Sequence, residues 1–96
     1  MRTPIIAGNW KMNTTVSEAA ALARAMKERL DAARSVERVL CPPFISLHVV
    51  GDVIAGTSIK LGAQNMYFEE KGAFTGEVSP LMLKDLCHYV ILGHSE

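Results

Sequence analysis

Short apolar runs alternate with segments of helical periodicity along this chain of 96 residues. Four runs are too short for buried helices and are predicted to be strands, at residues 4–7, 36–41, 59–63 and 89–92. Three segments between them favour helices, at residues 16–33, 46–55 and 80–87. The first run shows no polar alternation, which predicts a strand that is buried on both faces.

Capping signals mark two of the predicted helix starts. In the segment TVSE, Thr15 and Glu18 have the spacing of a capping box, in which each side chain accepts from the other residue's backbone amide. Ser79 precedes Pro80, and this pair is typical of a capping hydroxyl followed by the first helical residue. We therefore expect helices to begin after Thr15 and after Ser79, the latter continuing to about Cys87.

The order of the predicted elements is strand, helix, strand, helix, strand, helix, strand. Such alternation favours parallel strands joined by right-handed crossovers, so we expect an α/β fold forming a single domain over residues 1–96. Periodicity alone is compatible with an open flavodoxin-like sheet and with part of a closed barrel. The polar segment 64–78 is too long for an ordinary turn and by itself predicts only a long loop.

Composition narrows the classes of function. Ten basic residues balance ten acidic ones without a Lys/Arg cluster, which argues against a nucleic-acid partner. No apolar run approaches the ~18 residues of a membrane span, and the N-terminus lacks the features of a secretory signal, so a cytoplasmic location is expected. Cys41 and Cys87 are too few and too widely spaced for a disulfide framework or a zinc site, and we expect buried free thiols and no metal.

Three polar residues each follow the carboxyl end of a predicted strand, where parallel α/β folds bind ligands: Asn9, Lys11 and His94. Lys11 could hold an anionic substrate, Asn9 could donate a positioning hydrogen bond, and His94 could act as an acid or electrophile. Taken singly, each also has an ordinary explanation, as a solvated lysine, a turn-forming asparagine and a loop histidine.

Four motifs carry a resemblance to a known family. The segment AGNWKMN at residues 7–13 is similar to the first-strand signature of the triosephosphate isomerase family, and CPPF at 41–44 resembles its second-strand ending. GAQN at 62–65, followed by GAFTGEVS at 72–79, resembles its third loop, and ILGHSE at 91–96 resembles its fourth-strand signature. The motifs occur in the family's order over residues 4–96, at spacings that agree with the predicted elements.

The resemblance implies a portion of a TIM (β/α)8 barrel, comprising three βα units and the fourth strand. The implied activity interconverts dihydroxyacetone phosphate and glyceraldehyde 3-phosphate through an enediolate, in glycolysis and gluconeogenesis, without cofactor or metal. Asn9 and Lys11 would bind the phosphorylated triose, with Lys11 offsetting negative charge. His94 would polarise the carbonyl as a neutral imidazole, an assignment taken entirely from the family.

The resemblance also implies a homodimer formed through the loop at residues 64–79. In such a dimer Thr75 would reach into the neighbouring subunit's pocket, with Asn65 and Glu96 supporting the same region. A whole barrel has about 250 residues, and the family's catalytic glutamate and phosphate-binding loops match no position here. We therefore expect the isolated chain to be inactive or nearly so, and its open strand edges to promote self-association.

Two alternatives to a catalytic role remain at this stage. One is a non-catalytic barrel fragment that assembles with itself or complements the remaining portion. The other is an open-sheet anion-binding domain that uses Lys11 alone, in which His94→Gln would leave phosphate affinity unchanged.

Overall fold

A computed structural model describes residues 4–66 and 68–91. The elements follow in the predicted order: β1 (Ile5–Asn9), α1 (Val16–Ala32), β2 (Glu37–Cys41), a 3₁₀ turn η1 (Phe44–Ser46), α2 (Leu47–Ile54), β3 (Lys60–Ala63), α3 (Pro80–Leu83) and β4 (Tyr89–Val90). Within these described ranges, none of the helices combines the length and apolar character that crossing a membrane requires.

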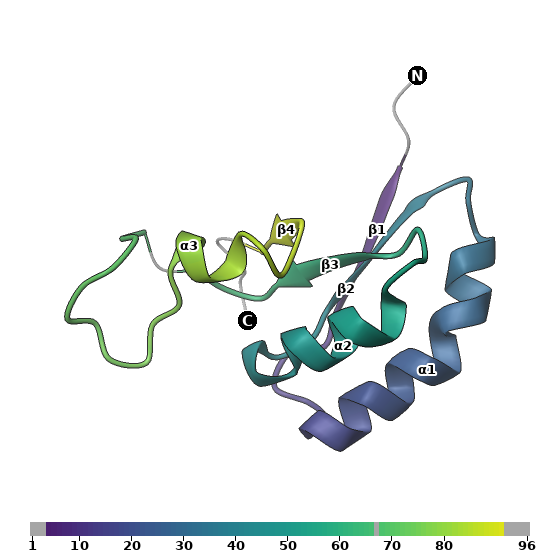
Figure 1. Ribbon diagram of the computed structural model, residues 1–96. Helices are drawn as coiled ribbons and strands as arrows, with labels where there is room; N and C mark the ends of the chain where they lie inside the picture. Colours follow the sequence, from purple (N-terminus) through teal and green to yellow (C-terminus); the bar gives the residue numbers. More distant parts are fainter. Residues whose placement is uncertain (1–3, 67, 92–96) are drawn as a thin grey trace.

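The four strands form one parallel sheet in the order β1-β2-β3-β4 (Figure 1). Ile5 pairs with Glu37 and Asn9 with Cys41, so β1 and β2 are aligned along their whole length. The curled sheet, with helices alternating between parallel strands, confirms the expected portion of a (β/α)8 barrel rather than an open flavodoxin-like sheet.

Helix α1 begins with the predicted capping box. Thr15 Oγ1 accepts from the Glu18 backbone amide at 3.3 Å, and Glu18 Oε1 accepts from the Thr15 amide at 2.8 Å. The residues that α1 buries are small, namely Ala19, Ala20 and Ala23, so that α1 approaches its neighbour α2 closely. Helix α2 in turn packs on β3.

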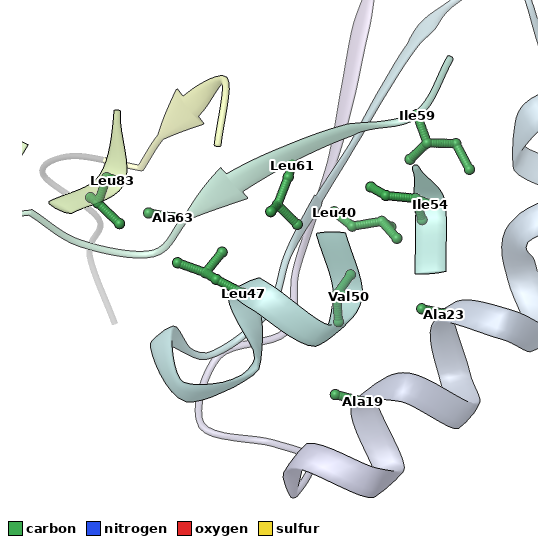
Figure 2. Close-up of a cluster of buried hydrophobic side chains, with 10 residues drawn as sticks. All are labelled: Ala19, Ala23, Leu40, Leu47, Val50, Ile54, Ile59, Leu61, Ala63 and Leu83. Carbon is green, nitrogen blue, oxygen red and sulfur yellow. The ribbon is translucent and has the colours of Figure 1, made fainter. Parts of the chain in front are cut away.

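The main apolar cluster lies between α2, the sheet and α1 (Figure 2). It contains residues from β2, from β3 and its flank, and from all three α-helices: Ala19, Ala23, Leu40, Leu47, Val50, Ile54, Ile59, Leu61, Ala63 and Leu83. Because Leu40, Leu61 and Ala63 come from adjacent parallel strands, this cluster fixes the relative positions of β2 and β3.

The sheet also has a close contact on Gly62 in β3. A Cβ atom at this position would lie 2.8 Å from Cys41 Sγ and 3.1 Å from Val39 Cγ1. The absence of a side chain at Gly62 therefore lets these two buried β2 residues occupy the space beside β3.

A polar network ties the end of α1 to the starts of β2 and β3. The Arg38 guanidinium, 5% exposed, donates through Nη1 to the carbonyls of Leu30 (2.9 Å) and Ala33 (2.8 Å) and through Nη2 to the Ser58 hydroxyl. Asp31 Oδ1 accepts from the Ser58 backbone amide at 2.9 Å and from its hydroxyl at 2.8 Å. The Ser58 bonds lower the pKa of Asp31, with a smaller contribution from nearby arginines.

Two sequence expectations were wrong in part. Ile5 and Ile6 are 55% and 60% exposed, so β1 is not buried on both faces, because the apolar cluster of the described residues contains no residue of β1. The third helix ends at Leu83 instead of Cys87. The backbone amides of residues 86 and 87 both donate to the Leu83 carbonyl, and the His88 backbone amide donates to the Leu61 carbonyl of β3. This last bond begins the pairing of the chain with β3 that continues in β4.

The second predicted helix was nearly right. It begins as the 3₁₀ turn η1, and the α-helical part spans Leu47–Ile54 with Gly51 inside it. Helix α3 has the expected cap, because Ser79 Oγ accepts from the Met82 amide at 3.2 Å and Pro80 occupies the first turn. The expected strand residue Leu92 lies outside the described residues.

Candidate functional site

The carboxyl ends of β1, β2 and β3 meet at one edge of the sheet. Strand β1 ends at Asn9, β2 at Cys41 and β3 at Ala63, and all three strands run in the same direction (Figure 1). The segments that follow these strands therefore lie next to one another. This edge holds two of the sequence-predicted site residues, Asn9 and Lys11, and a third polar residue, Gln64.

The segment after β1 is folded by its own asparagines. Asn9 Oδ1 accepts from the Lys11 backbone amide at 3.0 Å, and Asn13 Nδ2 donates to the Trp10 carbonyl at 2.8 Å. The Trp10 amide donates to the Cys41 carbonyl at 3.1 Å, which continues the β1–β2 pairing beyond the strand. Hydrogen bonds from a side chain to a nearby backbone group stabilise turns. The bond of Asn9 to the Lys11 amide is of this kind, so Asn9 acts as a turn-forming residue in the structure.

Lys11 has a left-handed backbone, with φ of 55°. For a residue with a Cβ atom this conformation costs about 1 kcal/mol or more, and it persists only where the surroundings hold it. Strained residues of this kind cluster at functional sites, because the fold fixes a side chain in a direction that a relaxed backbone would not give. The strain at Lys11 is thus an independent reason to examine it as a functional residue.

Gln64 connects the three strand ends. Its Nε2 donates to the Lys11 carbonyl at 2.9 Å and to the Cys41 carbonyl at 2.9 Å, so both amide hydrogens have acceptors on neighbouring segments. From the sequence, Gln64 belongs to the GAQN motif and begins the long loop, and it was given no role of its own. The available signal was its position immediately after a buried strand, at the same edge as Asn9 and Lys11, with an amide that can donate twice.

The other predicted site residues are distributed differently. Asn65 is exposed beside Gln64 and lines a cavity of about 220 Å³ between η1 and the long loop, together with Phe44, Met66 and other loop residues. Thr75 is exposed in the segment between β3 and α3, which extends away from the sheet (Figure 1). His94 and Glu96 lie outside the described residues.

Cys41 contributes to this edge through its backbone. Its side chain is 1% exposed, and burial raises the pKa of the Cys41 thiol, with a smaller effect from Cys87. Its carbonyl accepts from both the Trp10 amide and Gln64. The expected buried free thiol is thus found at Cys41, whereas Cys87 is free but only partly buried.

Residues 4–66 and 68–91 contain no grouping of three or more His, Cys, Asp or Glu side chains that could hold a metal ion. The polar groups of the strand edge are an ammonium, amides and backbone carbonyls. The ammonium and the amide N–H groups are donors, which suit an anionic, oxygen-rich molecule, whereas the carbonyls of Lys11 and Cys41 accept from Gln64.

Comparison with known proteins agrees with the motifs. A family model described as triosephosphate isomerase matches residues 4–96. The triosephosphate isomerase of Dehalococcoides mccartyi strain CBDB1 is 60% identical over 96 residues, covering 100% of this chain and 38% of that protein. That of Clostridium tetani is 57% identical over 97 residues, covering 100% of this chain and 38% of that protein.

A solved structure gives the same result. The crystal structure of triosephosphate isomerase from Bartonella henselae superposes with a TM-score of 0.88 at 40% sequence identity, covering 98% of this chain and 39% of that chain. The present chain therefore spans about 38% of the length of the curated relatives that it matches. With a family model matching nearly every residue and this structural agreement, the chain belongs to the triosephosphate isomerase family.

Proposed function

We propose that the whole protein is a triosephosphate isomerase and that this chain supplies part of its substrate-binding edge. The observation that carries the proposal is the strained Lys11, held at the carboxyl edge of a parallel sheet in a chain that belongs to this family. The substrate class is a phosphorylated triose. A cytoplasmic location and a role in glycolysis and gluconeogenesis belong to the same proposal and follow from the family.

Lys11 and Asn9 supply the binding chemistry in this proposal. The ammonium group of Lys11 offsets the negative charge of the phosphate and of the enediolate, which is worth more in the transition state than in the ground state because charge develops there. Asn9 orients Lys11 through its 3.0 Å bond to the Lys11 amide. The two amide hydrogens on Asn9 Nδ2 can donate to substrate oxygens.

His94 and the base complete the proposed mechanism. His94 polarises the substrate carbonyl and moves a proton between the two oxygens, a role assigned from the family signature at residues 91–96. Proton abstraction from carbon requires a carboxylate on a part of the barrel beyond the 38% that this chain matches. The isolated chain is accordingly expected to bind weakly and to lack turnover.

The proposal includes a homodimer formed through residues 64–79. Phe68 and Phe74 in this segment are 76% and 43% exposed, which favours burial of the loop against a second copy. Thr75 would then approach the partner's substrate pocket. Asn65 and Glu96 would support the same region of the assembled site.

Activity tests this proposal. The matched N-terminal part of the D. mccartyi CBDB1 enzyme is replaced with this chain, giving a completed barrel, and triose phosphate isomerisation is measured. We expect activity in the completed barrel and none in the isolated chain. Lys11→Ala should lower kcat/KM by at least about 100-fold. The matched control Lys84→Ala, at an exposed position after α3, should leave kcat/KM unchanged.

A completed barrel that folds but does not isomerise triose phosphates would contradict the proposal. If Lys11→Ala and Lys84→Ala lowered kcat/KM equally, the proposed role of Lys11 would be contradicted, but the proposed activity would not.

A second candidate function is a non-catalytic barrel fragment that assembles with itself or with the complementary part. The exposed Ile5 and Ile6 on the edge strand β1 favour it, because an apolar strand with unpaired backbone groups promotes strand addition. Analytical ultracentrifugation of the 96-residue chain separates the two functions. A defined oligomer, together with an inactive completed barrel, would favour the assembling fragment, whereas a monomer at high concentration would exclude self-assembly.

A further inference from the structure

We propose that Gln64 is a positioning residue that fixes the backbone of Lys11, and so the direction of the Lys11 ammonium group, at the carboxyl edge of the sheet. This inference rests on the proposed function insofar as it concerns catalysis. Its structural part, that Gln64 sets the conformation of Lys11, stands on the contacts of this chain.

Both peptide groups of Lys11 are held by side chains. Its amide donates to Asn9 Oδ1 at 3.0 Å, and its carbonyl accepts from Gln64 Nε2 at 2.9 Å. The φ angle of Lys11, 55° and so left-handed, belongs to the residue that joins these two bonded peptide groups. A residue with a Cβ atom leaves this conformation when it is released, and the rotation that relaxes φ also turns the bond from Cα to Cβ. Holding the two peptides therefore holds the side chain.

Gln64 is well placed to resist that rotation. It follows directly after β3, whose neighbouring residues Leu61 and Ala63 are buried in the core cluster. Its second amide hydrogen is bound to the Cys41 carbonyl at 2.9 Å, at the end of the adjacent strand β2. The donor that reaches Lys11 therefore directly follows β3 and is also bonded to the end of β2.

Loss of the Gln64 amide would fall mainly on Lys11. The Cys41 carbonyl keeps a second donor, the Trp10 amide at 3.1 Å, so the β1–β2 junction retains a hydrogen bond without Gln64. The Lys11 carbonyl belongs to an exposed residue and would exchange a fixed donor for water. If Gln64 served only the stability of the sheet, its loss would instead leave the Cys41 carbonyl without a donor.

The first test uses the 96-residue chain itself. In Gln64→Leu, which keeps a similar side-chain size but has no donor, the ¹³C shifts of Lys11 should lose the pattern of a left-handed residue, and the Lys11 amide should exchange faster with solvent. Val78, like Gln64, lines the cavity of about 220 Å³ between η1 and the long loop. The control Val78→Ala removes an apolar contact from that cavity and should leave the Lys11 shifts in place. Unchanged Lys11 shifts in folded Gln64→Leu would overturn the inference.

The second test measures kcat/KM in the completed barrel. Gln64→Leu should lower kcat/KM by about 10- to 100-fold in the presence of Lys11, as expected when a charged group is misplaced by roughly 1 Å. In a Lys11→Ala background the same change should cost less than about 3-fold, because the group that Gln64 positions is already gone. Val78→Ala should alter the folded fraction but not kcat/KM per folded molecule.

The outcomes separate this inference from the proposed function. Equal fold-losses with and without Lys11 would mean that Gln64 acts on the structure generally, and would overturn its positioning role. An inactive completed barrel with the natural residues would instead contradict the proposed function, and the nuclear magnetic resonance test would still decide whether Gln64 sets the backbone of Lys11.

Discussion

Gly62 offers a direct test of how tightly β2 and β3 are packed. A Cβ atom added by Gly62→Ala would lie 2.8 Å from Cys41 Sγ and 3.1 Å from Val39 Cγ1, whereas its 3.5 Å distance to Tyr89 Cβ is an ordinary contact. Cys41 is 1% exposed and Val39 is 2% exposed, so neither side chain can turn into solvent. The substitution therefore overpacks the sheet and pushes on Cys41, whose carbonyl accepts from Gln64.

Two opposing effects set the magnitude. Overpacking a buried site costs about 1–3 kcal/mol, whereas replacing Gly by Ala in an ordinary backbone conformation stabilises by about 0.4–1 kcal/mol through the unfolded state. We expect Gly62→Ala to lower the free energy of unfolding by about 1–2 kcal/mol. Cys41→Ala removes the sulfur that makes the shortest contact. In that background the cost of Gly62→Ala should fall below about 0.5 kcal/mol.

Urea unfolding followed by far-UV circular dichroism measures these free energies, at two protein concentrations so that self-association is visible. The control is Gly8→Ala, also in a strand, where the nearest atom to an added Cβ is Trp10 Nε1 at 3.7 Å and the change should be within about 0.5 kcal/mol. If Gly62→Ala costs the same with and without Cys41, the contact with Sγ does not limit packing and the reasoning is wrong.

Further predictions concern the cap of α1 and the network at its end. Thr15→Ala should lower the free energy of unfolding by about 1 kcal/mol, since it removes the acceptor for the Glu18 amide, and Thr15→Ser should restore most of it in the same urea titration. Arg38→Met should lower the free energy of unfolding by at least about 2 kcal/mol, since two carbonyls and Ser58 lose a buried charged donor. In the control Arg34→Met, the replaced side chain is 67% exposed and the loss should be under about 0.5 kcal/mol. Equal losses for the two substitutions would contradict the network. Because the folded pKa of Asp31 is lowered, its stabilising effect is present above the ordinary carboxyl value of about 3.9 and is lost as pH falls through the lowered pKa. Urea midpoints measured from about pH 6 down to about pH 3 should therefore drop more steeply for the natural chain than for Asp31→Asn, and parallel curves would refute the assignment.

Local sequence signals predicted the elements well. The capping box at Thr15 and the cap at Ser79 are confirmed, and the strands fall within a residue or two of the apolar runs. These features depend on residues that are near one another in sequence, and pattern analysis detects them for that reason. The burial of β1 was mispredicted, because burial depends on what packs on the faces of a strand, and the apolar cluster of the described residues contains no residue of β1.

The geometry of the candidate site was predicted only in outline. Asn9 and Lys11 were selected because they follow a strand, and the structure brings them to one edge with Gln64. The bond between Gln64 and Lys11 joins residues 53 positions apart and ends on a backbone carbonyl, which leaves no trace in a side-chain pattern. The left-handed φ of Lys11 could not be predicted from the sequence either, since lysine is not among the residue types enriched in this conformation. The roles of His94, Thr75, Asn65 and Glu96 stay predictions.

The most direct test of the central claim is a crystal structure of the completed barrel with a bound phosphorylated triose analogue. The account predicts that the ligand lies at the carboxyl edge of β1 to β3, with the Lys11 ammonium within hydrogen-bond distance of a ligand oxygen. Lys11 should keep its left-handed backbone, and Gln64 should still donate to its carbonyl. A ligand bound elsewhere, or a Lys11 side chain directed away from a ligand at this edge, would contradict the account.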